Sequence, residues 1–289
     1  DDYPRFIYAT EHLQIRKSIL MVSGENRVLI RYDVDACPPK AVLRLKPFVA
    51  FRNHHALTKE NSELSMEARE AKNGFIMKPY RDLPSLYFQS NAKSSFSPSP
   101  VWYRNFEYPV EERRGYDWRE DLFCPGIMEV PVKTGSVVIV TAATAPLKGQ
   151  LKKIWTVEEE RRLHLVESCD AFGGQLDSEE DKNHLSRLLF AGQQFLIRTP
   201  SGRPGVIAGY HWFQDWGRDT LISLPGLTFC SGRSREGIEI LNAIASSEKD
   251  GLLPNYFAEG GGEHAYNTVD TALWYFWAVQ QMLKYTGDM

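Results

Sequence analysis

The residues with the clearest chemical potential lie in one short segment, 210–220, where aromatic and charged side chains are crowded together. A sugar ring has apolar C–H faces and a rim of hydroxyl groups. Tryptophan and tyrosine can cover the faces, while aspartate and arginine can bind the hydroxyls through charge-assisted hydrogen bonds. The segment therefore fits a carbohydrate-binding subsite. Its candidate residues are Trp212, Asp215, Trp216, Arg218 and Asp219.

A structural explanation competes for the same segment. Trp212, Phe213 and Trp216 can equally pack a loop. Asp219 can be the N-cap of a helix, because a side-chain oxygen at that position accepts hydrogen bonds from free backbone N–H groups. Two aspartates as close as Asp215 and Asp219 are common in proteins. Composition alone does not separate the two explanations.

A second group of candidates follows about one helix–loop–helix unit later. Asp270 comes 51 positions after Asp219. In a barrel of helical hairpins, residues one hairpin apart reach the same rim, so we expect both aspartates to face one pocket. Asp270 can instead be another N-cap, Asn255 a turn residue, and Trp274 a core aromatic. The candidates of this group are Asn255, Tyr266, Asn267, Asp270 and Trp274.

The first half of the chain has the pattern of a β domain. Short runs rich in Val, Ile, Tyr and Phe are separated by breaks that contain Pro, Gly, Asn and Ser, which is typical of a β-sandwich. Strands are expected over Val28–Val34, Val42–Phe51, Phe75–Tyr80, Ser85–Gln89, Val101–Tyr108, Ile127–Val132 and Ser136–Ala142.

The second half has helical spacing of its apolar residues. The segment Glu158–Glu167 is expected to be a first helix or a linker. The further expected helices are a long one from a cap at Asp177 or Ser178 through Arg198, and then Asp219–Cys230, Ser234–Ser247 and Val269–Tyr285. Loops are expected at 202–205 and 251–267, and the segment 210–220 is expected to be a loop entering a helix. The predicted domains are a β-sandwich at 1–150 and a helical domain at 151–289.

Composition excludes several classes of function. The formal net charge is −3, so there is no basic field for nucleic acid. The longest apolar stretches, such as Val137–Ala143, are too short to span a membrane. The four cysteines are scattered without metal-ligand spacing, and no nucleotide-binding motif occurs. No cofactor or metal is expected. The absence of a signal-peptide pattern and of a disulfide framework favours the cytoplasm.

The order of several segments resembles one known family. Residues 207–222, together with 224–227, 251–255 and 266–274, are similar to the C-terminal domain of glycogen debranching enzymes. Segments 43–55 and 102–123 are similar to the N-terminal domain of the shorter, prokaryotic form. The resemblance covers nearly the whole chain and implies a β-sandwich followed by an (α/α)₆ barrel that is truncated here.

The resemblance also implies an activity. The family releases glucose from α-1,6 branch stubs of glycogen or limit dextrin, and inversion requires a general acid and a base that activates water. The family's acid lies in a Trp-Met-Asp-like segment that this sequence lacks, so acid and base are expected beyond Met289 and no catalytic residue is assigned. Arg218 and Asp219 are expected to hold the terminal glucose and Trp216 to wall it. The chain alone is expected to be inactive.

Other interpretations stay open at this stage. A glucoamylase- or trehalase-type barrel enzyme would have a similar helical domain, and product analysis on branched dextrin against trehalose separates these activities. A non-catalytic glucan-binding protein belongs to a different class, and it would bind maltooligosaccharides without turnover. Oligomeric state is not predicted.

Overall fold

The computed structural model describes residues 3–53, 56–170, 178–210, 213–258 and 262–287, with only the backbone at 165–170. The chain divides into two compact units, Asp1–Glu160 and Arg161–Met289. The division falls inside helix α2 (Leu151–Asp170). The domain boundary expected at residue 150 stays a prediction.

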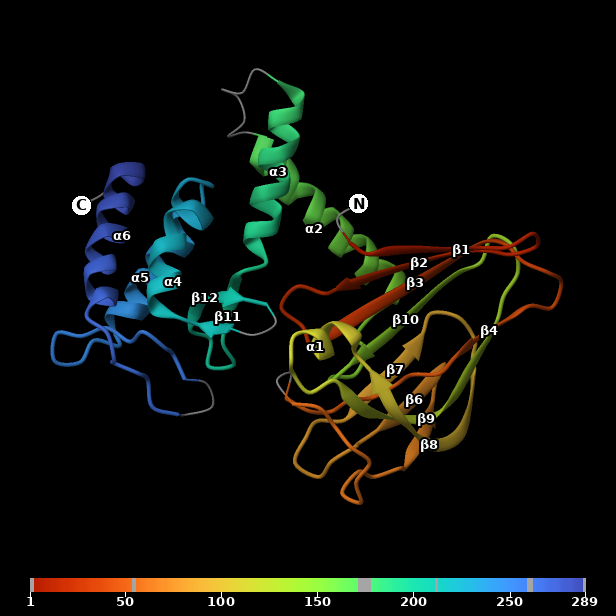
Figure 1. Cartoon of the computed structure of the whole chain (residues 1–289). Coiled ribbons are helices and arrows are strands. Elements are labelled where there is room, and N and C mark those ends of the chain that lie inside the picture. The colour runs from red at the N-terminus through yellow and green to blue at the C-terminus, as the bar shows by residue number, and fades with distance from the viewer. Residues whose placement is uncertain (1–2, 54–55, 171–177, 211–212, 259–261, 288–289) are drawn as a thin grey trace. The chain divides into compact units, whose positions relative to one another are not determined.

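The first unit is built from two antiparallel sheets (Figure 1). The larger sheet has seven strands in the order β1-β2-β3-β10-β7-β6-β5, and the smaller has the order β4-β9-β8. The strands of the larger sheet are β1 (Arg5–Ala9), β2 (Gln14–Met21), β3 (Arg27–Ala36), β5 (Ala68–Ala71), β6 (Gly74–Met77), β7 (Leu86–Ser90) and β10 (Val137–Ala143); those of the smaller are β4 (Val42–Leu45), β8 (Ser95–Glu107) and β9 (Arg119–Pro131).

One apolar core joins the two sheets. Phe75 of β6 stacks on Phe96 of β8 with ring centroids 4.2 Å apart, and both rings are buried in the same cluster as Val34, Phe123 and Val140. Face-to-face packing of this kind is the arrangement of a β-sandwich. The antiparallel β domain expected from the alternating pattern is therefore confirmed.

The larger sheet is also covered on its other face. Leu151 and Trp155, in the first turns of α2, pack with Leu20, Leu29 and Ile139 of the sheet. A sheet buried on both faces loses the simple alternation of apolar and polar residues. The helix was expected only from Glu158, but it begins seven residues earlier, at Leu151.

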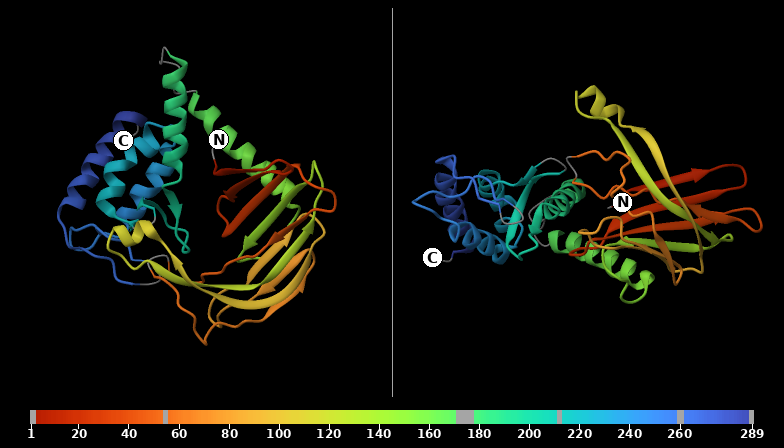
Figure 2. Two further views of the ribbon diagram at one scale, coloured as in Figure 1. Left: turned by 45° about the vertical axis from the view of Figure 1, so that its right-hand side comes forward. Right: turned by 90° about the horizontal axis from the view of Figure 1, so that it is seen from below.

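A long hairpin projects from the smaller sheet (Figure 2). Strands β8 and β9 form it, and a short helix, α1 (Pro109–Arg113), lies at its tip. Its register shifts between Pro98 and Val101 and again between Tyr103 and Phe106. Such bulges increase the local twist of an antiparallel pair.

The second unit is not all helical. Its helices are α3 (Glu179–Gln193), α4 (Gly217–Leu224), α5 (Ser234–Ala245) and α6 (Asp270–Thr286), and a π-helical turn, Pro225–Phe229, continues α4. Between α3 and α4 lies a three-stranded antiparallel sheet, β11 (Leu196–Arg198), β12 (Pro204–Gly209) and β13 (Phe213–Asp215). The long helix expected through Arg198 is therefore wrong at its end, and part of the loop expected before α4 is a strand.

The core of this unit is formed by residues of β12 and of helices α4, α5 and α6. Leu221 and Leu224 of α4, Ile240 and Ile244 of α5, and Ala278 of α6 are buried in one cluster. On α3, Ser178 is the expected cap: its hydroxyl accepts from the Asp181 backbone N–H at 3.0 Å. The (α/α)₆ barrel stays a prediction.

Candidate functional site

Three segments that are distant in sequence meet at the start of helix α4. The Gly217 N–H donates to the Asn255 carbonyl at 2.9 Å, and Trp216 and Tyr256 form a β-bridge. A Cβ on Gly217 would lie 2.1 Å from the Pro254 carbonyl oxygen and 2.8 Å from Cγ2 of Thr271. Glycine is required here because backbone and side chain approach it so closely. The contacts bring the first turn of α4, the loop at 254–256 and the start of α6 together.

A charged pair spans the two helix starts. Nη1 of Arg218 donates to Oδ2 of Asp270 at 3.0 Å, with the side chains 44% and 36% exposed. The Thr268 hydroxyl and then the Arg218 guanidinium hold the pKa of the Asp270 carboxyl below its ordinary value. The sequence suggested both residues for the site but not their pairing.

Asp219 lies beside this pair without being a cap. The N-cap of α4 is Trp216 and that of α6 is Val269, so the alternative in which Asp219 and Asp270 are N-caps is wrong. Asp219 is the third residue of its helix and Asp270 the first of its own. Negative charge in a first turn is stabilised by the helix dipole. Asp219 is exposed, and within the described residues its carboxylate has no hydrogen-bond or ion-pair partner, so it is open to a ligand hydroxyl.

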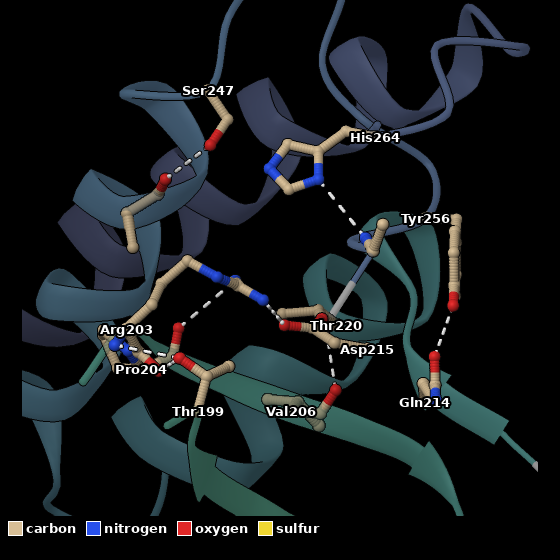
Figure 3. Close-up of polar contacts among 12 residues, drawn as sticks. Thr199, Arg203, Pro204, Val206, Gln214, Asp215, Thr220, Ser247, Tyr256 and His264 are labelled. Atoms are coloured by element: carbon tan, nitrogen blue, oxygen red, sulfur yellow. Dashed lines mark hydrogen bonds and ion pairs between the residues drawn. The ribbon is translucent and has the colours of Figure 1, made fainter. Parts of the chain in front are cut away.

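Asp215 has a different position, in the interior. It is 4% exposed; its Oδ2 accepts from Nη2 of Arg203 at 2.7 Å and its Oδ1 from the Thr220 hydroxyl at 3.1 Å. Figure 3 shows the Arg203 and Thr220 side chains both reaching its carboxylate. Asp215 therefore helps to hold the segment 213–220 in place through contacts in the interior. Arg203 is a residue that the sequence analysis missed, because a single arginine in a Gly- and Pro-rich turn carries no periodic signal.

Two aromatic candidates have different surroundings. Trp216 is half-buried, and its ring centroid is 5.4 Å from that of Tyr256, a residue not singled out from the sequence. The Tyr256 hydroxyl donates to Oε1 of Gln214 (Figure 3). Trp274 instead meets Trp277 edge to face at 5.4 Å and packs against the core of the unit.

Most of the remaining candidates form hydrogen bonds with other residues of the chain. Asn255 is 3% exposed, and its side-chain oxygen accepts from the Thr271 hydroxyl at 3.4 Å. The Tyr266 hydroxyl donates to the Ser247 carbonyl at 2.8 Å, while Asn267 is exposed. Trp212 lies outside the described residues. Trp216, Arg218 and Asp219 thus lie together at the start of α4, and the ion pair with Arg218 brings Asp270 to them. These four residues form one accessible edge, and Asp215 and Asn255 are buried.

The described part of the chain has neither a candidate metal site nor a membrane-spanning helix. The side chains that the structure describes contain no group of three His, Cys, Asp or Glu residues arranged to hold a metal ion. None of the helices in these ranges is both long and apolar enough to span a membrane.

Two known protein families match different parts of the chain. The family described as "Glycogen debranching enzyme N terminal" matches residues 1–139, which are most of the β unit. The family described as "Amylo-alpha-1,6-glucosidase" matches residues 190–289, which include the whole candidate site. The chain belongs to the glycogen debranching enzyme family.

Individual relatives match only part of this chain, and this chain matches only part of each relative. A glycogen debranching enzyme of Saccharomyces cerevisiae (strain ATCC 204508 / S288c) is 35% identical over 90 residues, which are 29% of this chain and 6% of the yeast protein. A bacterial glucoamylase, solved in complex with acarbose, aligns with 88% of this chain and 42% of its own, at 13% identity and a TM-score of 0.48. The chain therefore spans less than half of either protein.

Proposed function

We propose that this chain supplies the sugar-binding part of an amylo-α-1,6-glucosidase, which releases glucose from α-1,6 branch stubs of glycogen or limit dextrin in the cytoplasm. The observation that carries the proposal is the ion pair of Arg218 with Asp270, with Asp219 one residue away. In this proposal helices α3 to α6 belong to an (α/α)₆ barrel that begins near residue 151.

The proposed chemistry is recognition of a terminal glucose. Hexose hydroxyls both donate and accept hydrogen bonds, so a guanidinium beside two carboxylates meets both needs. The half-buried ring of Trp216 covers an apolar sugar face. Asn255, Tyr266, Asn267 and Trp274 are proposed to complete the surroundings, with Trp212 and the buried Asp215. Of these, Asp215 and Asn255 act by fixing the segments that bear the others.

Hydrolysis by inversion needs a general acid on the glycosidic oxygen and a base for the attacking water. We assign neither role to a residue of this chain. Its contribution is to hold the sugar ring more tightly in the transition state than in the ground state, which raises kcat.

The test is product analysis with the complete enzyme. A dextrin with single-glucose α-1,6 stubs should give free glucose, detected first as the β-anomer by NMR because inversion changes the anomeric configuration. Trehalose should give none. Glucose release from trehalose but not from the branched dextrin would overturn the assigned specificity. Binding of maltooligosaccharides in calorimetry without turnover of any substrate would favour a glucan-binding protein instead.

A further inference from the structure

Arg203 forms a buried ionic contact that the proposed function does not use. Its Nη2 lies 2.7 Å from Oδ2 of Asp215, and the side chains are only 21% and 5% exposed. The flat guanidinium also covers the Phe257 ring, with its central carbon 4.2 Å from the ring centroid. Arg203 thus contacts, at once, the strand before helix α4 and the loop that follows residue 254.

Asp215 in turn connects the parts that carry the sugar-binding candidates. Its backbone carbonyl accepts from the Phe257 N–H at 3.1 Å, and its Oδ1 accepts from the Thr220 hydroxyl in α4. It is followed directly by Trp216 and Gly217, and the Thr220 N–H donates to the Trp216 carbonyl at 2.8 Å. Any displacement of Asp215 therefore moves both the loop and the helix start.

The backbone around Asp215 is shaped for this contact. A Cβ on Gly205 would lie 2.3 Å from Oδ2 of Asp215 and 3.2 Å from its Cγ. Gly205 pairs within the hairpin of β11 and β12, directly after the turn that contains Arg203. The carboxylate thus lies against a backbone that leaves room for it, and Nη1 of Arg203 would lie 3.6 Å from the same Cβ position.

From these contacts we propose that Arg203 is a positioning residue of the sugar-binding edge. It acts through Asp215 and Phe257 to fix Trp216, Arg218 and Asp219 for a terminal hexose, without touching the sugar itself. The inference rests on the proposed function for the identity of the ligand. The physical reason is that losing a cationic partner makes a buried carboxylate costly, so the segment around it rearranges or takes up a proton.

Arginine suits this position better than lysine. A guanidinium can bond a carboxylate in its plane while its face lies on an aromatic ring, whereas an ammonium is a compact point charge. Arg203→Lys is therefore expected to restore part of the function lost in Arg203→Met. A role of the positive charge alone would make the lysine variant equal to wild type.

The experiment compares Arg203→Met with Arg198→Met in the complete protein. Arg198 is a matched control: it belongs to the same hairpin and pairs with Glu239 at 2.7 Å, but it is 59% exposed. Two readouts are taken. Hydrogen exchange is measured on peptides that cover 216–221 and 253–257, and kcat and KM are measured separately on the branched dextrin.

We expect Arg203→Met to raise exchange about tenfold or more in both peptides and to lower kcat/KM about 100-fold or more. Arg203→Lys should be intermediate, and Arg198→Met should match wild type in both readouts. Unchanged exchange in a folded Arg203→Met variant would overturn the inference, and so would raised exchange with wild-type kcat and KM.

A second variant covers the case in which Arg203→Met does not fold. Asp215→Asn keeps the shape of the side chain and its acceptor for Thr220 but removes the charge that Arg203 neutralises, and it should raise exchange in the same peptides. If it does not, the inference fails. A wild-type protein that releases no glucose and binds no glucan would contradict the proposed function. If the exchange effects still appear in that case, the conclusion that Arg203 fixes these segments is unaffected.

Discussion

Arg218 donates a hydrogen bond from Nη1 to Oδ2 of Asp270, 52 positions later in the sequence, at 3.0 Å. The bond connects the first turn of α4 with the first residue of α6. The bond therefore holds the two helix starts next to each other, and the dipole at each start favours negative charge. The pair is accessible, so a ligand can compete for either partner.

The first prediction concerns this pair. Because both side chains are more than a third exposed, Arg218→Met and Asp270→Asn should each change protein stability little. Each should nevertheless lower kcat/KM on a branched dextrin about 100-fold, since each binds substrate hydroxyls in the transition state. In a double-mutant cycle, the combined loss should be clearly smaller than the product of the single losses. Fully multiplicative losses would mean that the two residues act separately.

The second prediction concerns pH. The Thr268 hydroxyl and the Arg218 guanidinium lower the pKa of Asp270, so its charged form persists to lower pH in the folded protein than in the unfolded chain. Its contribution to stability is complete above the unfolded value, about 4, and is lost as pH falls through the folded value.

Asp270 therefore stays charged from about pH 5 to 8, and its titration should cause no change in sugar affinity, measured by calorimetry, across this range. In Arg218→Met, the acid limb of any remaining binding should move to higher pH, because the Asp270 carboxyl loses one of its stabilising partners. An acid limb that does not move would contradict the assigned coupling.

The third prediction tests the close approach at the start of α4. Gly217→Ala places a methyl group against the Pro254 carbonyl and Thr271, and it should lower the free energy of unfolding by about 1–3 kcal/mol or more. Gly226→Ala is the control, because nothing lies within 4 Å of its Cβ position. Urea denaturation of both variants checks the prediction. Equal stability of the two would show that the segments do not meet as closely as described.

The fourth prediction concerns a buried carboxylate of the β unit. Glu120 is 0% exposed; Arg52 donates to its two oxygens at 2.5 and 2.8 Å, and the Tyr108 hydroxyl donates at 2.8 Å. Burial raises the pKa of the Glu120 carboxyl, but these hydrogen bonds outweigh burial and hold the pKa below its ordinary value. Its contribution to stability is therefore present above the unfolded pKa and lost as pH falls through the folded one.

Removing Arg52 should weaken this dependence. In Arg52→Met the hydrogen bonds of Tyr108 and the Thr58 backbone remain, but burial is opposed less, so the pKa of Glu120 rises relative to the wild-type protein and its contribution at neutral pH falls. The variant should lose about 3–5 kcal/mol at neutral pH and less near about pH 4. Denaturant unfolding across this range, with exposed Arg44→Met as control, measures the difference. A loss that is independent of pH would contradict it.

Much of the β unit could be predicted from its alternation. Strands β3, β7 and β10 lie close to their expected ranges because each contributes apolar residues to the core between the sheets, and β3 and β10 also carry apolar residues on the face that α2 covers. β1 was missed because every residue of this edge strand is exposed, so no alternation marks it. The start expected for helix α2, Glu158, was too late. Leu151, Ile154 and Trp155 pack against the sheet, and their helical spacing was a signal present in the sequence.

The site was only partly accessible to sequence reasoning. Its aromatic and charged composition indicated Trp216, Arg218, Asp219 and Asp270, which the structure brings to one edge. Composition could not reveal that Asp215 is buried, because its burial depends on Arg203 across a hairpin. That hairpin was itself missed, since short apolar runs such as Leu196–Arg198 fit a helix as well as a strand.

The most direct test is the kcat/KM for glucose release from a dextrin with single-glucose α-1,6 stubs, measured for Asp219→Asn in the complete enzyme. The control is Glu236→Gln, which has the same first-turn position in α5 and so reports any general effect of a lost first-turn charge. We expect kcat/KM to fall about 100-fold or more for Asp219→Asn, with little change in thermal unfolding, and the control to equal wild type. A kcat/KM for Asp219→Asn near that of wild type would contradict the claim that this edge holds the terminal glucose.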